Sequence, residues 1–183
     1  MPAIIAMLRA VNVGPHNRIK MDDLRAVFES IGLANPQTYV QSGNIIFQTN
    51  KRDLEAHARE IEAAIEQKFG FRSDVILRTA GEMKDVIAKN PFADREGIEP
   101  GKLLVTFLAG QPAAEGRDYI RTITGGPEEL HLIGRELYIY FPNGSGRSKL
   151  PVAAIAKKLK TPGTARNWNS ITKMLEMAET LKR

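Results

Sequence analysis

The sequence predicts an α+β fold in which one order of elements, β-α-β-β-α-β, occurs twice and is followed by a final helix. Short apolar runs bounded by glycine, proline or asparagine alternate with longer segments whose apolar residues recur at helical spacing. A β-hairpin signal occurs at the corresponding place in each half, at Ser42-Gly43-Asn44 and at Gly134-Arg135. This order is the split βαβ, or α-β plait, arrangement, so we expect two ferredoxin-like subdomains in tandem with a C-terminal helix.

The first subdomain is expected over residues 1–80. Its first helix is predicted because apolar residues from Met21 to Ile31 have helical spacing and Gly32 stands where a helix commonly ends. The expected elements are a strand at 3–10, a helix at 21–31, hairpin strands at 38–41 and 45–48, a helix at 53–69 and a strand at 74–79.

A connecting segment is expected over residues 81–101 and the second subdomain over 102–183. The connection begins with a short helix at 81–89, which Asn90-Pro91-Phe92 ends, and continues as a loop. The second half is expected to contain a strand at 102–108, a helix at 113–123, hairpin strands at 129–133 and 136–141, a helix at 150–160, an edge strand at 163–166 and the final helix. No residue-level repeat relates the halves, so the predicted duplication concerns the order of elements only.

The composition narrows the classes of function. The 183 residues include no cysteine, which excludes disulfides, thiolate catalysis, cysteine-type zinc sites and iron–sulfur clusters. Residues 1–9 resemble a first strand rather than a signal peptide, and no run approaches the roughly 20 apolar residues of a membrane span. We therefore expect a cytoplasmic protein that does not bind membranes.

Residues for catalysis or metal binding are not evident. His16, His57 and His131 lack the spacing of metal ligands, and His57 is expected on an exposed helix face among charges. No nucleophile elbow or paired-carboxylate pattern occurs. The sequence predicts no metal and no cofactor, identifies no catalytic residue, and leaves open whether the protein is an enzyme.

The charge distribution singles out the C-terminal region. The net charge is +5, yet residues 143–175 contain no acidic residue at all. The positive side chains of this region are Arg147, Lys149, Lys157, Lys158, Lys160, Arg166 and Lys173. Such a region can attract an anionic partner, and the alternative is an ordinary solvated basic face.

The strongest local candidate for an anion site is the glycine-rich segment 143–149, which directly precedes a predicted helix. Glycines allow successive backbone N–H groups to converge, Arg147 and Lys149 add positive charge, and Ser148 is expected to cap the helix. The spacing of a Walker A motif is absent. The alternative is a flexible loop with an ordinary helix cap.

A second candidate lies at the start of the final helix, where Arg166, Asn167, Trp168 and Asn169 follow one another. Arginine can bind a phosphate or carboxylate with two hydrogen bonds, and tryptophan can stack on a base or ring. The alternative is structural, with Asn167 or Asn169 as the helix cap and Trp168 packed in the core.

A third candidate combines Arg9 and Asn12, which follow the first strand, with the turn that contains Ser42 and Asn44. Ligand sites are often built where such a strand ends. An asparagine beside a turn also has a local role, because it tolerates positive φ and bonds its own backbone. Arg9 is interpreted either as a site residue or as one member of a structural ion pair.

Aromatic residues on the predicted central strands raise the question of nucleic-acid binding. RNA-recognition modules of this plan stack bases on such aromatics, and Phe47, Tyr138 and Tyr140 occupy these strands. No run matches the signature of those modules, however. Core packing explains the same residues equally well.

Five stretches together carry a resemblance to a known family. They are residues 7–14 (MLRAVNVG), 38–44 (TYVQSGN), 90–92 (NPF), 140–150 (YFPNGSGRSKL) and 164–170 (TARNWNS). The chain resembles the bacterial domain-of-unknown-function family 1697 over essentially its whole length. Ala10 stands where that family usually has glycine and Ser170 where it usually has threonine. The resemblance implies two ferredoxin-like subdomains and implies no activity.

Three hypotheses of function follow. The first is a binder of a phosphate-bearing or other anionic small molecule, whose basic pocket between the subdomains would be lined by Arg9, Asn12, Arg147, Lys149, Arg166 and Asn167. The second is a nucleic-acid-binding protein that uses the basic region 143–175 and Trp168. The third is a protein–protein interaction module that uses a sheet edge or the final helix. The sequence gives no oligomeric state.

Overall fold

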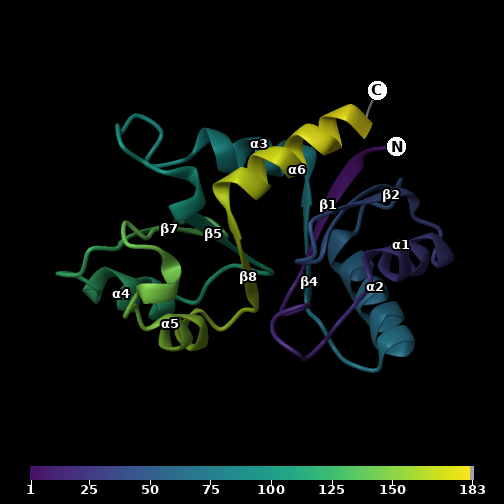
Figure 1. Cartoon of the computed structure of the whole chain (residues 1–183), viewed down its shortest axis with the longest axis horizontal. Helices are drawn as coiled ribbons and strands as arrows, with labels where there is room; N and C mark the ends of the chain where they lie inside the picture. The colour runs from purple at the N-terminus through teal and green to yellow at the C-terminus, as the bar shows by residue number, and fades with distance from the viewer. Residues whose placement is uncertain (182–183) are drawn as a thin grey trace. The chain divides into compact units, whose positions relative to one another are not determined.

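The structure is a computed structural model, and it describes residues 1–181 (Figure 1). The chain divides into two compact units. The first unit comprises Met1–Asp85 and the C-terminal residues from Thr172 onwards, and the second comprises Val86–Ile171. Each unit contains one four-stranded antiparallel sheet with helices, so the predicted α+β fold of two similar subdomains and a C-terminal helix is confirmed.

The first unit contains the predicted β-α-β-β-α-β order. Its elements are β1 (Ala3–Leu8), α1 (Met21–Ser30), β2 (Ala34–Tyr39), β3 (Asn44–Gln48), α2 (Leu54–Phe69) and β4 (Val75–Thr79), after which α3 (Ala80–Ala88) begins. The strand order is β2-β3-β1-β4, and β1 pairs antiparallel with both neighbours, as in Ala6↔Ile45 and Ala6↔Leu77. This strand order is that of the split βαβ plan.

Local signals in the sequence set the ends of both helices of this unit. After α1, the Gly32 N–H donates to the Glu29 carbonyl and the Leu33 N–H to the Phe28 carbonyl, at 3.0 and 3.1 Å. This pair of bonds is the Schellman arrangement, which needs the left-handed backbone that Gly32 adopts at φ +81°. The Asp53 side chain accepts from the Ala56 N–H at the start of α2, and a left-handed Gly70 follows its end.

The core of the first unit lies between one face of the sheet and the helices α1 and α2, which lie on the same side of the strands in Figure 1. The prediction that His57 is exposed is wrong, because the residue is 1% exposed and its ring packs edge-on against Phe47 at 5.7 Å. The physical reason is helical spacing. His57, Ile61 and Ile65 follow one another at intervals of four, so His57 belongs to the buried stripe of α2.

The second unit repeats the same plan. Its elements are η1 (Pro100–Lys102), β5 (Leu103–Leu108), α4 (Ala114–Thr122), β6 (Glu129–Ile133), β7 (Glu136–Tyr140), η2 (Ser145–Arg147), α5 (Val152–Leu159) and β8 (Gly163–Asn167). The strand order β6-β7-β5-β8 matches that of the first unit position by position, and β8 is an edge strand as predicted. Its core includes Leu108, Ile120, Leu137, Ile139 and Ile155.

Residues 86–99 of the second unit, which precede η1 and β5, cover Tyr138 and Tyr140. The Tyr138 hydroxyl donates to the Val86 carbonyl at 2.6 Å, and the Tyr140 hydroxyl accepts from the Glu99 N–H at 3.1 Å. The ring of Phe92 lies 5.8 Å from that of Tyr140. Both tyrosines are therefore buried by packing, and burial raises the pKa of Tyr138. They do not form an open platform on which bases could stack.

The last helix, α6 (Trp168–Leu181), follows β8 directly. Residues from Thr172 onwards group with the first unit, where the Gln48 side-chain amide donates to the Leu181 carbonyl at 3.1 Å and Lys84 pairs with Glu179 at 2.9 Å. None of the helices in the described part of the chain has the length and apolarity to span a bilayer.

Candidate ligand-binding site

Two loops of the first unit meet where β1 ends. Residues 9–20 connect β1 to α1, and residues 40–43 connect β2 to β3. Because β1 and β3 run antiparallel, with Met7 opposite Asn44, the end of β1 lies beside the start of β3. The Leu8 N–H donates to the Gly43 carbonyl at 2.9 Å. The stretches 7–14 and 38–44, which carry the family resemblance, are therefore neighbours in space.

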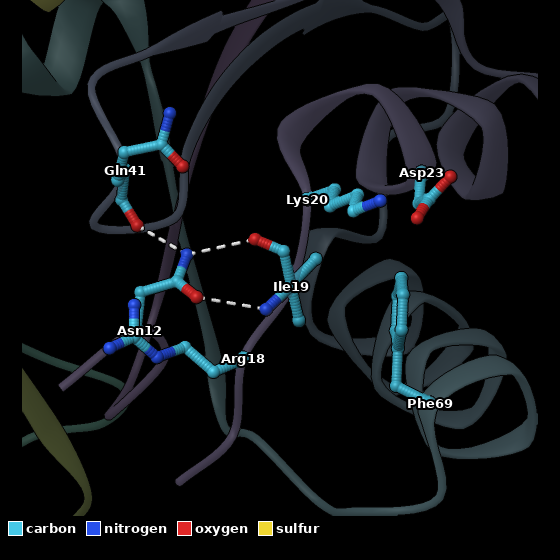
Figure 2. Close-up of a pocket in the computed structure, with 7 residues that line it drawn as sticks. All are labelled: Asn12, Arg18, Ile19, Lys20, Asp23, Gln41 and Phe69. Carbon is cyan, nitrogen blue, oxygen red and sulfur yellow. Dashed lines mark hydrogen bonds between the residues drawn. The ribbon is translucent and has the colours of Figure 1, made fainter. Parts of the chain in front are cut away.

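The side chain of Asn12 joins the two loops. Its amide nitrogen donates to the Gln41 carbonyl at 2.7 Å and to the Ile19 carbonyl at 3.0 Å, and its oxygen accepts from the Ile19 N–H at 2.8 Å (Figure 2). Three hydrogen bonds from one side chain hold the loop 9–20 closed on itself and against the turn 40–43. The predicted site residue Asn12 thus positions the backbone.

A hollow of about 470 Å³ opens beside this junction. Its lining comes from the loop 9–20, the first turn of α1, the turn 40–43 and the end of α2 (Figure 2). The lining residues are Asn12, Arg18, Ile19, Lys20, Asp23, Gln41 and Phe69. This volume is within the range of small-molecule sites.

Three charged side chains line the hollow, namely Arg18, Lys20 and Asp23. None of them forms a hydrogen bond or an ion pair with another side chain among residues 1–181, whereas their neighbour Asp22 pairs with Arg25. Charged groups without a protein partner are available for a ligand, and arginine is suited to a phosphate or carboxylate because it offers two parallel N–H donors.

The backbone around the hollow is strained. Six non-glycine residues of the described chain have positive φ, and four of them, Ala10, Asn12, Asn17 and Val40, lie in the two loops that meet here. Their φ values are 57°, 54°, 54° and 52°. Asparagine tolerates this conformation, but alanine and β-branched valine adopt it at a cost of about 1–2 kcal/mol.

Gly43 allows the two loops to approach each other closely. A Cβ atom at this position would lie 2.6 Å from Val11 Cγ2 and 2.8 Å from Leu8 Cβ, and the residue has φ +81°. Both the contact and the conformation therefore require glycine here.

The other site residues predicted in this unit have structural partners. Arg9 is about half exposed and pairs with Asp74 at 3.3 Å, in agreement with the ion-pair interpretation. Asn44 is fully buried, and its amide donates to the Tyr39 carbonyl at 3.0 Å and to the Ser42 hydroxyl at 2.9 Å. These bonds lie within the turn, in line with the local alternative for Asn44, although Asn44 is not among the residues with positive φ, and Ser42 shares in that turn.

The glycine-rich segment 143–149 lies in the second unit, and the prediction that Ser148 caps a helix is wrong. α5 begins at Val152 with Pro151 in the cap position, because a proline restricts the residue before it to extended backbone and a helix cannot start earlier. The Ser148 hydroxyl donates to Glu128 at 2.6 Å and accepts from the Leu150 N–H. Arg147 and Lys149 are exposed, and neither side chain has a polar partner in the part of the chain that the structure describes.

At the start of α6, Asn167 has the capping role of the structural alternative, and Arg166 is buried with hydrogen-bond partners of its own. The Asn167 side chain accepts from the Ser170 N–H at 2.9 Å and caps the helix. Arg166 is 7% exposed and donates to the Thr164 hydroxyl at 2.7 Å and to the Ala165 carbonyl at 2.9 Å. Burial lowers the pKa of Arg166 to about 10. Trp168 is half-buried and Asn169 is exposed.

Acidic residues from outside 143–175 neutralise part of its positive charge. Glu115 pairs with both Lys158 and Lys160, at 3.3 and 3.0 Å, and Glu176 pairs with Lys173 at 3.3 Å. These contacts lower the pKa of the Glu115 carboxyl. With Arg166 buried as well, the region has less free positive charge than the sequence indicates.

The structure therefore brings together only part of the predicted set. Asn12 joins the turn that contains Ser42 and Asn44, while the other candidates from Arg147 onwards belong to the second unit. Sequence reasoning did not select Arg18, Lys20, Asp23, Gln41 or Phe69. The available signal was the pair of cations directly before a helix. No group of three histidine, aspartate or glutamate side chains that could hold a metal ion occurs among residues 1–181.

Comparisons with known proteins show the fold and the family. The conserved bacterial protein SP0830 from Streptococcus pneumoniae has a similar structure, with a TM-score of 0.72 and 19% identity over 97% of this chain and 98% of that one. At this identity the likeness shows the fold alone. No functionally curated protein matches the chain. The family model "Protein of unknown function (DUF1697)" matches residues 1–138, a region that holds three of the five stretches that carry the resemblance. The chain therefore belongs to the DUF1697 family, proteins of unknown function.

Proposed function

We propose that the first unit binds a small molecule that carries a phosphate or carboxylate group, in the hollow beside the end of β1. The observation that carries this proposal is the placement of Arg18 and Lys20, two cations without a protein partner among residues 1–181, on a hollow framed by strained loops. The anionic group would contact Arg18 and Lys20, and Asn12 would keep the loops in position.

The strain supports a binding role for this place. Left-handed backbone at Ala10 and Val40 lowers stability, and the hydrogen bonds of Asn12 to Ile19 and Gln41 join the two loops that contain these residues. Residues in such conformations concentrate at functional sites, where the surrounding structure holds them in place. Loops carried by a rigid sheet are also the usual location of ligand sites in folds of this kind.

The remaining candidates stay predictions. Arg147 and Lys149 in the second unit are available for an anion because no side chain of the described chain pairs with them. A nucleic-acid partner for the region 143–175 is less well supported, since Lys158, Lys160 and Lys173 have acidic partners. The cytoplasmic location also stays a prediction.

The proposal is tested by an NMR titration of the ¹⁵N-labelled full chain with ethyl phosphate. We expect shifts at the amides of Asn12, Ile19 and Gln41, whose backbone surrounds the hollow. The double variant Arg18→Gln/Lys20→Gln should bind at least about tenfold more weakly, because the charge-assisted hydrogen bonds are lost.

A matched control is the double variant Arg52→Gln/Lys68→Gln. It removes two exposed cations of the same unit that do not line this hollow and that have no ion pair within residues 1–181. Its affinity should equal that of the native protein. If both double variants lose affinity equally, only the net charge matters, and the assignment of the site fails. If no amide shifts with millimolar ethyl phosphate, the proposed function fails.

A further inference from the structure

Asp23 is the acidic member of the hollow. It lies in the first turn of α1, its side chain is exposed, and it forms no ion pair or hydrogen bond within the described chain. The preceding residue, Asp22, also lies in this turn, but it forms an ion pair with Arg25. One of two adjacent carboxylates is thus neutralised within the protein, and the one that lines the hollow is not.

Lys20 is three residues before Asp23, a spacing at which helical side chains commonly pair. Lysine–glutamate pairs at this spacing form elsewhere among residues 1–181, such as Lys102 with Glu99 at 2.6 Å and Lys173 with Glu176 at 3.3 Å. Lys20, the residue before α1, and Asp23 form no ion pair in the described chain.

In Figure 2 the Lys20 side chain extends toward Asp23 without forming an ion pair, Arg18 lies on the side of the view away from Asp23, and Phe69 lies below Asp23. A ligand with anionic groups only would bring negative charge close to the Asp23 carboxylate, which has no ion-pair partner within the described chain, and that repulsion would weaken binding. A cationic group on the ligand removes the repulsion and gives Asp23 a partner.

From this charge arrangement we infer that the ligand of the hollow is a zwitterion, a phosphate or carboxylate joined to an amine. This inference rests on the proposed function. The anionic group contacts Arg18 and Lys20, the ammonium group contacts Asp23, and the connecting carbon chain lies against Ile19 and the ring of Phe69. The Phe69 ring, half-buried at the end of α2, also offers an aromatic face to the cation.

The test compares two probes of similar size, O-phosphoethanolamine and ethyl phosphate, in NMR titrations of the full chain. We expect the native protein to bind phosphoethanolamine about tenfold more tightly, a difference that corresponds to one additional charge-assisted contact. Asp23→Asn should abolish this preference, because it removes the partner of the ammonium group, and should leave ethyl phosphate binding equal or tighter.

Asp22→Asn is the matched control, since it makes the same charge change in the same helical turn at a carboxylate that Arg25 already neutralises. It should keep the tenfold preference. Equal affinity for both probes in the native protein, with Arg18 and Lys20 still required, overturns the zwitterion and leaves the anion site intact. Binding of neither probe refutes the proposed function and this inference together. Thermal unfolding of each variant verifies that the fold is retained.

Discussion

The two units have the same strand order but differ in the lengths of two loops, the one after the first strand and the one between the second and third strands. In the first unit, residues 9–20 connect β1 to α1, and four residues, 40–43, connect the next two strands. In the second unit the corresponding connections are residues 109–113 and the two residues 134–135. The first unit thus uses twelve and four residues where the second uses five and two.

The short connection of the second unit is fixed by hydrogen bonds to the segment around the end of α5. The Ala109 N–H donates to the Pro162 carbonyl, the Gly110 N–H to the Thr161 hydroxyl and the Ala113 N–H to the Leu159 carbonyl, at 2.9, 2.9 and 3.0 Å. In the first unit the longer loop folds around Asn12 and borders a hollow. The two units therefore combine the same strand order with different loops. A function is expected to depend on these loops rather than on the fold.

The largest expected effect comes from Gly43→Ala, which forces the two loops of the first unit apart. The new methyl group would contact Val11 and Leu8 at 2.6 and 2.8 Å, in a residue with φ +81°. We expect a loss of about 3 kcal/mol in the free energy of unfolding, measured by urea denaturation, since overpacking and left-handed strain add.

Gly14→Ala is the control for that variant. Gly14 has φ +65° in the same loop region, but no atom lies within 4 Å of a Cβ atom at this position. The loss should be about 1 kcal/mol, from backbone strain alone. Equal losses in both variants would show that the close approach at Gly43 does not hold the loops together.

The second effect concerns the hydrogen bonds of Asn12. Asn12→Ala removes three bonds to the Ile19 and Gln41 backbone, and we expect a loss of about 2 kcal/mol in the free energy of unfolding. Hydrogen exchange of the Ile19 amide, which donates to Asn12, should become faster. Asn17→Ala is matched in backbone conformation, at φ 54°, but loses a single bond of 3.4 Å. A loss as large in Asn17→Ala would assign the effect to backbone conformation instead.

The fold was predictable because its signals are local. The spacing of apolar residues, the cap at Asp53 and the left-handed glycines at positions 32 and 70 each specify one element without reference to the rest of the chain. The element order then selects the topology. The one wrong prediction about a core residue, His57, arose from the charges around it in sequence, although its spacing from Ile61 indicated the buried face.

The site was less predictable because its residues meet only through the fold. Asn12 and Gln41 come from loops that pairing of β1 with β3 brings together, and Phe69 comes from the end of α2. Whether a cation is free depends on acidic residues far away in sequence. Glu115 neutralises Lys158 and Lys160, and nothing within 143–175 indicates this. The sequence also could not reveal positive φ at Val40, a residue type that rarely adopts it.

The third and smaller expected effect is a dependence of stability on pH, which a buried histidine of the first unit should cause. His57 of the first unit is buried, and its Nε2 atom has no hydrogen-bond partner among residues 1–181. Burial lowers the pKa of His57 below 6.5, although a contact with Glu60 partly opposes the change. The unfolded chain therefore takes up the proton first, and the stability of the native state falls as the pH decreases below about 6.5.

The measurement is the free energy of unfolding from pH 7.5 to 5.5, which should decrease by at most about 1.4 kcal/mol per pH unit. This range lies above the pKa of Glu60, which Lys51 and His57 hold below its usual value of 4.5. His57→Phe should flatten the profile. A profile equally steep in His57→Phe would mean that another group titrates.

The smallest effect tests the strain itself, which the two units do not share. Five of the six non-glycine residues with positive φ in the described chain belong to the first unit, and the sixth, Lys160, ends α5, where such a conformation is ordinary. Val40→Gly should therefore raise the free energy of unfolding by about 0.5–1 kcal/mol, because glycine adopts this backbone without the steric cost. Val13→Gly, at an exposed valine of the neighbouring loop with ordinary φ, should lower the free energy of unfolding by a similar amount.

If Val40→Gly is as destabilising as Val13→Gly, the left-handed backbone carries no strain, and the argument from strain that these loops are shaped for a ligand is lost. If it stabilises the protein while weakening ethyl phosphate binding, the strain is maintained for the site, and the contrast with the unstrained second unit becomes functional.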